Sequence, residues 1–299
     1  MTSKQTIVES LPTIIQSLNV ISNEGGKSVN LAGKGVSLFL YHESILNDTV
    51  RASIEYVDTG SNFQTSDNKN VRESLPIVGT EKVEIKLADN NNTKIGDSPK
   101  LNLYVNKVTP IGDDARKTAV RLDLVSKEFL LNEKIRLRTR FDGRISDHIN
   151  KILTENIPDG LQTEKNVDIE ETQNNVNFIS NNKKSFWTLN WLSKKAVSQQ
   201  NQKKGVSAGY FFYETSEGFF FKSIDGLLAQ KPKKRIIYNE VPDEEGKTIN
   251  KLDYDYKALS YSKNDLINAQ SKFELGTFAT RVVTFDPFKC QYRVYNPNS

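Results

Sequence analysis

The feature that most constrains this chain is a pair of aromatic runs between residues 209 and 222. Two runs of β-favouring residues, separated by a short polar turn that ends in Gly218, predict a β-hairpin. Side chains alternate between the faces of a strand, so Tyr210 and Phe212 share one face and the neighbouring rings share the other. Each ring can bury roughly 150–250 Å². The hairpin therefore needs cover on both faces, from other parts of the chain or from another chain.

Alternating hydrophobicity dominates the chain from residue 36 onward. It is clearest over residues 50–56, where Val, Ala, Ile and Tyr alternate with Arg, Ser and Glu, as in a strand with one face in water. Further strands are predicted around polar turns, including one at residues 112–114. Because no helical period separates these strands, they predict a small antiparallel barrel or sandwich. We assign residues 36–135 to this first β-barrel domain.

The segments that flank this domain are assigned differently. The apolar residues of segment 1–35 have helical spacing that Pro12 interrupts, so we predict an N-terminal arm, either extended or a short broken helix. Residues 136–208 are predicted to form a helical connecting segment. Its first helix is expected over residues 143–155, with Asp142 as a candidate N-cap.

A second helix of the connecting segment is expected over residues 185–196 and has a wide aromatic face. Trp187 and Trp191 lie four residues apart and therefore on one side of a helix. We expect this helix to pack on one side of the aromatic hairpin. The candidates for packing or for an interface are Trp187, Trp191, Tyr210, Phe212, Phe219 and Phe221.

The last part of the chain, residues 209–299, combines the hairpin with further predicted strands. These strands are expected at residues 236–238, 258–261, 282–285 and 292–295. They are fewer than a closed barrel needs, so we predict a second, incomplete β-barrel domain. The fold class is therefore mainly β with a helical insertion (α+β), in which a helical segment joins two small antiparallel β-barrel domains.

Composition limits the kinds of site that this chain can hold. Cys290 is the only cysteine, which excludes an internal disulfide framework and a four-cysteine zinc site. The two histidines, His42 and His148, leave little for metal or triad chemistry, so we expect no metal and no cofactor. No apolar run approaches the ~20 residues that span a bilayer, and the N-terminus does not resemble a signal peptide. We expect an intracellular protein at synthesis, with no membrane partner.

One string favours an enzyme. Asp58-Thr59-Gly60 follows a predicted strand, which is the context in which aspartic proteases carry a catalytic carboxylate. A single-chain protease needs another such string, and the sequence has none. An aspartic protease that uses Asp58 stays an alternative, and the competing interpretation is a turn that closes the strand.

A further alternative is a binding module for single-stranded nucleic acid. The rings of Tyr210, Phe212 and Phe219 could stack on bases, and the basic run over residues 231–235 could contact phosphates. The net charge of +4 is too small to indicate nucleic-acid binding by itself. Buried packing of the rings and a solvated basic run are the competing interpretations.

Four stretches, taken in order, resemble the baseplate hub protein of contractile-tailed (myovirus) bacteriophages. The two N-terminal stretches resemble the family's opening strands, the next resembles the strand and helix that close its first barrel, and the last resembles its helix and hairpin. The stretches are residues 39–46 with 50–58, residues 75–81 with 83–87, residues 120–129 with 135–150, and residues 186–195 with 209–225. They cover most of residues 36–230, and the likeness is one of order and pattern.

The resemblance implies two tube-type β-barrel domains in each chain. Three copies would form a homotrimeric ring of six similar domains, which matches a threefold central spike protein to a sixfold tail tube or its initiator proteins. The role would be structural and not enzymatic, in the baseplate of the virion tail after assembly in the host cytoplasm. DNA would pass through the lumen without sequence-specific contacts. The candidate basic residues of the lumen are Lys231, Lys233, Lys234 and Arg235.

Overall fold

The structure is a computed structural model of the 299-residue chain. The residues it describes are 14–23, 27–33, 35–59, 75, 77–88, 100–114, 117–155, 157, 159–199, 209–232, 236–238, 256–257, 260–262, 269–274 and 281–295. The chain divides into two units. The first comprises Met1–Gln202 and Val206–Leu227, and the second comprises Lys203–Gly205 and Leu228–Ser299.

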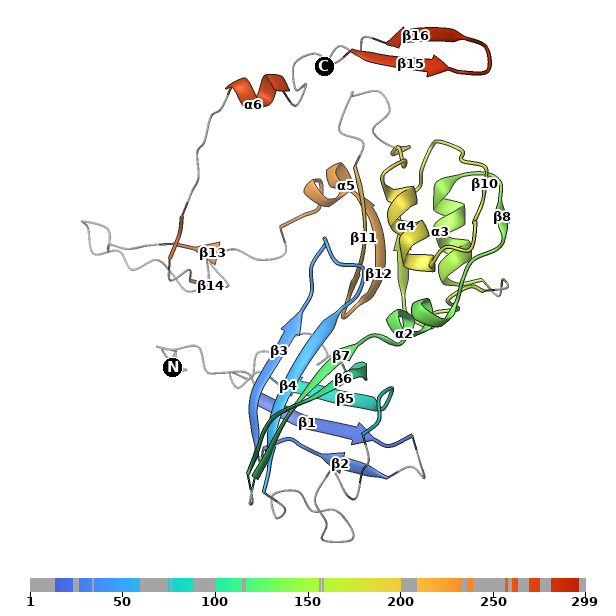
Figure 1. Ribbon diagram of the computed structural model, residues 1–299. Helices are drawn as coiled ribbons and strands as arrows, with labels where there is room; N and C mark the ends of the chain where they lie inside the picture. The colour runs from blue at the N-terminus through green and yellow to red at the C-terminus, as the bar shows by residue number, and fades with distance from the viewer. Residues whose placement is uncertain are drawn as a thin grey trace, which may run out of the picture. The chain divides into compact units, whose positions relative to one another are not determined.

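The first unit begins with one antiparallel sheet of seven strands in the order β2-β1-β5-β6-β7-β4-β3. The strands are β1 (Ile14–Ile21), β2 (Ser28–Asn30), β3 (Val36–His42), β4 (Arg51–Asp58), β5 (Lys82–Ala88), β6 (Leu101–Asp114) and β7 (Lys117–Val125). The sheet is strongly curled, like half of a barrel, and β2 and β3 are its two end strands (Figure 1). This arrangement confirms the prediction of a mainly β fold.

The concave core of this sheet explains why these segments are strands. Ile54 and Leu122 face each other across β4 and β7 and are fully buried, as the period-two pattern predicts. Leu18 and Val20 of β1 are also fully buried, and β1 pairs with β5. Strands β1 and β2 therefore lie within the residues that the sequence analysis assigns to an N-terminal arm. The alternation around Leu18 is short and follows a helix-like run, which is why the sequence pattern does not separate it.

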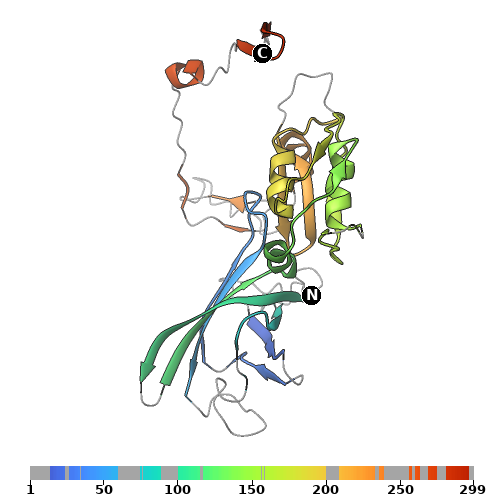
Figure 2. The same cartoon turned by 45° about the vertical axis from the view of Figure 1, so that its right-hand side comes forward.

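Strands β6 and β7 form a long ribbon that projects beyond the rest of the sheet (Figure 2). The prediction of a turn at residues 112–114 is wrong, because β6 continues through Asp114. β6 pairs with β5 only as far as Tyr104, so the described strands leave one edge of its other half unpaired. Pro110 lies in that half, next to a register shift, where a residue without a backbone N–H is tolerated.

The rest of the first unit is an α/β lobe built around a three-stranded sheet in the order β11-β12-β9. Strand β12 is antiparallel to β11 and parallel to β9. Helices α3 and α4 lie beside this sheet (Figure 1). The elements are α2 (Lys127–Lys134), β8 (Arg140–Phe141), α3 (Ile145–Leu153), β9 (Val167–Ile169), β10 (Phe178–Ile179), α4 (Ser185–Ser193), β11 (Tyr210–Thr215), β12 (Gly218–Ser223) and α5 (Ile224–Leu228).

One hydrophobic core joins the predicted connecting segment to the predicted hairpin. It contains Ile149 of α3 and Phe186 of α4 together with Phe212 and Phe219 of the hairpin. The boundary that the sequence analysis places between residues 208 and 209 runs through this core. The sequence pattern could not reveal this, because the residues that join the two parts are separated by more than 20 positions.

Helix α3 has the predicted apolar face but a different N-terminus. Its inward residues Ile145, Ile149 and Ile152 are fully buried. The prediction of Asp142 as N-cap is wrong, because the helix begins at Ile145 and Arg144 occupies the capping position. The Asp142 carboxylate instead accepts a hydrogen bond from Arg140 Nε at 2.7 Å.

The second unit is described in short segments. They are β13 (Ile236–Ile237), β14 (Tyr256–Lys257), α6 (Ala269–Glu274), β15 (Val282–Asp286) and β16 (Gln291–Tyr295). β15 and β16 form an antiparallel hairpin at the two predicted C-terminal strands. Part of the strand predicted at residues 258–261 lies outside the described residues, and the second barrel stays a prediction.

Candidate assembly surfaces

The aromatic hairpin of β11 and β12 is sealed on one face by its own chain. Tyr210, Phe212, Phe219 and Phe221 share this face, and each ring is at most 5% exposed. Phe212 and Phe219 stack with centroids 5.8 Å apart, and Phe186 of α4 lies 5.6 Å from Phe212. The predicted packing of this helix on the hairpin is therefore observed, with Phe186 as the contacting ring.

The opposite face of the hairpin is covered less completely. Tyr213 is buried and stacks on Phe220 at 5.3 Å, while Phe211 and Phe220 are half-buried. Lys222 on this face donates to Asp168 of β9 at 2.6 Å. The interpretation that Tyr210, Phe212 and Phe219 stack on nucleic-acid bases is wrong, because those three rings lie in the core and offer no open face.

Of the two other aromatic candidates, Trp187 is not part of this core, and Trp191 packs against its margin. Trp187 is 49% exposed, and Trp191 is half-buried against Phe178 at 5.1 Å. The two indoles are parallel, with centroids 6.3 Å apart. Of the four predicted basic lumen residues, Lys231 is exposed and the other three lie outside the described residues.

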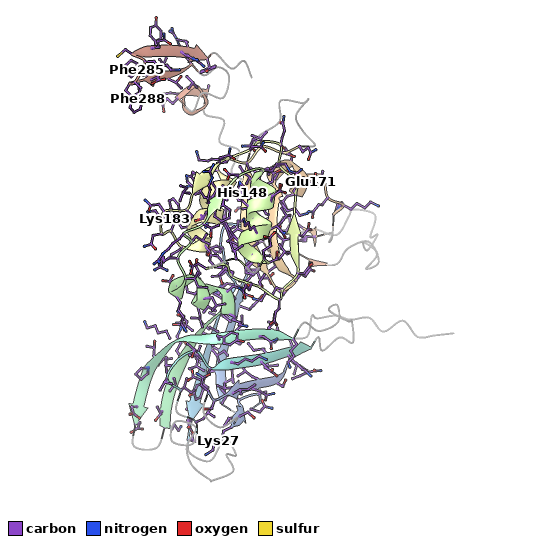
Figure 3. All side chains as sticks on the ribbon, turned by 90° about the vertical axis from the view of Figure 1, so that its right-hand side faces the viewer. Lys27, His148, Glu171, Lys183, Phe285 and Phe288 are labelled. Atoms are coloured by element: carbon purple, nitrogen blue, oxygen red, sulfur yellow. The ribbon has the colours of Figure 1, made fainter. Side chains whose placement is uncertain are left out.

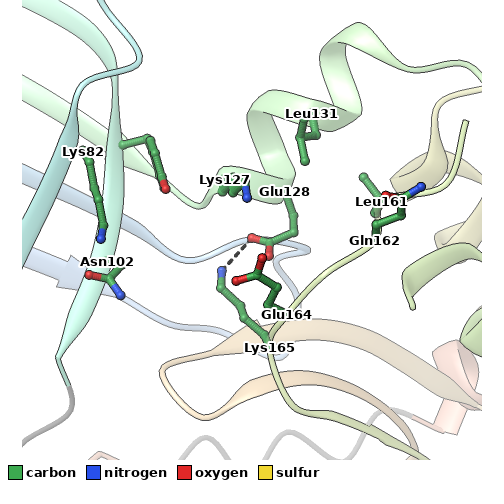
Figure 4. Close-up of a pocket in the computed structure, with 10 residues that line it drawn as sticks. Lys82, Asn102, Lys127, Glu128, Leu131, Leu161, Gln162, Glu164 and Lys165 are labelled. Atoms are coloured by element: carbon green, nitrogen blue, oxygen red, sulfur yellow. Dashed lines mark hydrogen bonds and ion pairs between the residues drawn. The ribbon is translucent and has the colours of Figure 1, made fainter. Parts of the chain in front are cut away.

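A buried ionic cluster connects the curled sheet to the α/β lobe. The Lys165 ammonium lies 2.7 Å from a Glu128 carboxylate oxygen, as Figure 4 shows, and 2.5 Å from a Glu214 oxygen. Glu214 also accepts a hydrogen bond from the backbone N–H of Val50, which precedes β4, at 3.1 Å. Burial raises the pKa of Glu214, and the Lys165 ammonium offsets this effect only in part. No sequence motif marks this cluster, because its three ionic residues lie far apart along the chain.

A cleft of about 300 Å³ opens beside this cluster, between β5 and β6 on one side and α2 on the other (Figure 4). Lys82, Asn102 and Tyr104 line its sheet side, and Glu128 and Lys165 line its helix side. The Lys82 ammonium forms an ion pair with the Glu84 carboxylate, with a nitrogen–oxygen distance of 2.7 Å. The cleft does not bring together any of the residues that the sequence analysis singles out.

The end strand β3 is the clearest open edge of the curled sheet. Among the described strands it pairs with β4 alone, so its other edge presents backbone groups without a strand partner. Leu40 on β3 is exposed, and Leu46 in the following turn is 76% exposed. The Glu43 carboxylate, just before this turn, accepts a hydrogen bond from the backbone N–H of Ser216 in the hairpin turn. The exposed residues Leu40 and Leu46 therefore lie close in sequence to a hydrogen bond that fixes this part of the chain to the hairpin turn.

Another apolar surface lies on the hairpin of β15 and β16 in the second unit. Figure 3 shows Phe285 and Phe288 on this hairpin. Phe288 is almost completely exposed. Isolated two-stranded hairpins are marginally stable in water. The other exposed apolar residues of the hairpin are Val282, Val283, Tyr292, Val294 and Tyr295.

The residues considered for catalysis or metal binding do not form a site in the described structure. Asp58 is the last residue of β4 and lies opposite Thr118 of β7, while Gly60 is outside the described residues. His148 is buried in the lobe, and its Nε2 lies 2.8 Å from the Val176 carbonyl oxygen. Within the described ranges, no cluster of metal-ligating side chains occurs. Over those same residues, no helix combines the length and apolar character that a membrane span requires.

The likenesses found among solved structures are distant, and two of them are with tail or secretion-system proteins. No protein-family model matches the chain, and no curated protein sequence matches it significantly. A tail protein from Neisseria meningitidis is similar with a TM-score of 0.45 and 11% identity, over 79% of this chain and 58% of that one. A component of the E. coli type VI secretion system, described as structurally similar to bacteriophage T4 tail proteins, has a TM-score of 0.34 and 10% identity, over 70% and 46%. The chain thus spans less than two thirds of either protein.

Proposed function

We propose that this chain is a structural subunit of a phage-type tail, a baseplate hub protein whose copies form a homotrimeric ring between the central spike and the tail tube. The ordered resemblance of four stretches to the hub family supports this role. The curled antiparallel sheet provides a wall of the kind that a tube-type domain needs.

The observation that carries the proposal is the open edge of this wall at β3. An exposed strand edge is a template for pairing with another chain unless charge, proline or a covering element blocks it. β3 holds Leu38, Phe39 and Leu40 in succession and contains no lysine or proline. Pairing of this edge with a neighbouring copy would continue the sheet around a ring and cover the apolar turn at Leu46.

The remaining partners follow from this assembly. The ring would contact the spike protein on one side and the tail tube or its initiator on the other, inside the virion tail. DNA would pass through its lumen with diffuse electrostatic contacts, to which Lys231 and the basic residues after it could contribute. An obligate ring of this kind should bury well over ~2,000 Å² at its interfaces.

The test is the mass of the purified full chain in solution, measured by light scattering. We expect three times the chain mass of 33.9 kDa. Leu46→Lys should shift the population to single chains, with association weakened roughly tenfold or more, because the new charge would be buried in the ring. Leu46 is too exposed for this change to unfold the monomer.

The matched control is Leu228→Lys, which places the same charge at another strongly exposed leucine. It should leave the mass unchanged. A wild-type chain that stays monomeric at high concentration, or equal masses for both variants, would remove the proposal.

A further inference from the structure

Helix α4 and the residues that flank it present a row of four side chains on the surface of the α/β lobe. Trp187 and Trp191 lie one turn apart on the same side of α4, and Lys183 and Lys195 lie just beyond its two ends. The two indoles stack in the middle of the row. The Lys183 ammonium lies 5.0 Å from the centroid of Trp187, and the Lys195 ammonium lies 5.0 Å from that of Trp191. We call this row the indole ladder.

The indole ladder lies mostly on the outer side of the lobe: Trp187 is half exposed, while Trp191 keeps one contact with the core, at Phe178. Lys183 and Lys195 are exposed, and Figure 3 shows Lys183 at the outer surface of the lobe. The opposite side of α4, with Phe186, Leu189 and Leu192, supplies the buried contacts. The exposed ring of Trp187 is therefore not required for packing of the helix.

The ammonium groups and indole N–H groups of the ladder can donate hydrogen bonds to acceptors of a partner. Among the described residues, neither Lys183 nor Lys195 has a carboxylate within ion-pair distance, and neither indole N–H donates a hydrogen bond. Exposed Trp rings with neighbouring cations are typical of protein interfaces, where tryptophans contribute much of the binding energy. A partner that supplies acceptors and negative charge would complement all four side chains.

The ring geometry decides between two acidic partners. A nucleic-acid strand binds aromatic residues through the open faces of their rings. Here each indole has the other indole toward one side and an ammonium group over its ring, and Trp191 also contacts the Phe178 ring, so little open ring face is left for stacking on a base. A protein segment can contact ring edges with aliphatic side chains and place carboxylates at the two ammonium groups.

We propose that the indole ladder is a docking surface for an acidic, amphipathic segment of a partner protein. Carboxylates at the two ends of the segment would pair with Lys183 and Lys195, and aliphatic side chains between them would cover Trp187 and Trp191. The two ammonium groups lie at the two ends of the stacked indole pair, and their separation sets the spacing of the carboxylates. The proposal depends on the indole ladder alone and does not require the ring at β3.

The chain offers a built-in reporter, because its only two tryptophans are the two of the ladder. The full chain is titrated with an 18-residue helical peptide that carries glutamates in its first and last turns and leucines on the same face. Tryptophan emission should change saturably with the peptide. The double variant Lys183→Gln, Lys195→Gln should weaken binding roughly fivefold to tenfold, because two exposed ion pairs are lost.

The matched control is Lys107→Gln, Lys117→Gln, which removes the same charge from two exposed lysines of the β6–β7 ribbon. This control variant should bind the acidic peptide as well as the wild type does. A peptide with glutamine in place of glutamate tests the other side of the ion pairs. Its binding to the wild type should be as weak as binding of the acidic peptide to the Lys183→Gln, Lys195→Gln variant. No emission change with the acidic peptide would overturn the proposal. Binding of a 15-nucleotide thymidine strand in its place would assign the ladder to nucleic acid. Loss of self-association in the ladder variant would assign it to another copy of the chain.

Discussion

At the residue scale, Gly218 is the position in the hairpin where no residue other than glycine fits. Its φ of +139° lies in the region that favours glycine, and a Cβ added there would lie 2.1 Å from the Asn166 carbonyl oxygen. That oxygen accepts the backbone N–H of Phe219 at 2.8 Å. The backbone of the turn and the backbone of the segment before β9 are therefore in direct contact.

We expect Gly218→Ala to lower the free energy of unfolding by about 2 kcal/mol or more, because backbone strain and the clash with Asn166 add together. The measurement is urea unfolding of the full chain. Gly112→Ala is the control, because a Cβ at Gly112 meets nothing within 4 Å. Equal unfolding midpoints for the two variants would contradict this account of the turn.

At the scale of elements, Glu170 joins the end of β12 to the segment after β9. Its carboxylate accepts hydrogen bonds from the backbone N–H of Ser223 at 2.8 Å, from the Ser223 hydroxyl at 2.7 Å and from the Ser198 hydroxyl at 2.8 Å. Partial burial acts to raise the pKa of Glu170, but these hydrogen bonds and that of Tyr210 outweigh it, so the pKa lies below its ordinary value.

This pKa shift predicts a dependence of stability on pH. Because the carboxylate binds its proton less readily in the folded chain, its contribution is fully present above the unfolded pKa of about 4.3 and is lost as the pH falls through the lower folded value. Glu170→Gln should cost about 1–2 kcal/mol at pH 7 and make unfolding less sensitive to pH in this acid range. Urea unfolding at several pH values checks this. An unchanged acid slope would show that Glu170 is not the group responsible.

At the scale of the first unit, the ionic cluster at Lys165 couples the sheet to the lobe. Burial acts to lower the pKa of Lys165, but the charges of Glu214 and Glu128 and their hydrogen bonds outweigh it, so the pKa is raised. The ammonium thus stays charged between two buried carboxylates. Removing one partner of such a cluster costs more than the cluster contributes, because the other charges stay buried and unpaired.

We therefore expect Lys165→Met to lower the free energy of unfolding by about 3 kcal/mol. Lys127→Met, at an exposed lysine of the same cleft with no ion pair among the described residues, should change it by less than about 0.5 kcal/mol. Chemical denaturation followed by circular dichroism measures both. If the two variants unfold alike, the cluster does not stabilise the junction.

Local pattern in the sequence was sufficient for several elements. The period-two run at residues 50–56 became β4, the aromatic runs around Gly218 became β11 and β12, and the isoleucines from Ile145 became the buried face of α3. Each of these follows from the geometry of a strand or helix and from apolar burial, which act between near neighbours. The mainly β fold class was predictable for the same reason.

Only the tertiary structure decided which residues pack over the aromatic hairpin and which groups pair with the buried carboxylates. The sequence indicates that the aromatic rings of β11 and β12 must be buried against another element. It does not show that Phe186 makes this contact while Trp187, one position later, is half exposed. Neighbouring helix positions differ by about 100° in direction, so packing against β11 and β12 fixes the rotation of α4. The partners of Glu214 and Glu170 are likewise set by contacts between distant segments, which leave no pattern along the chain.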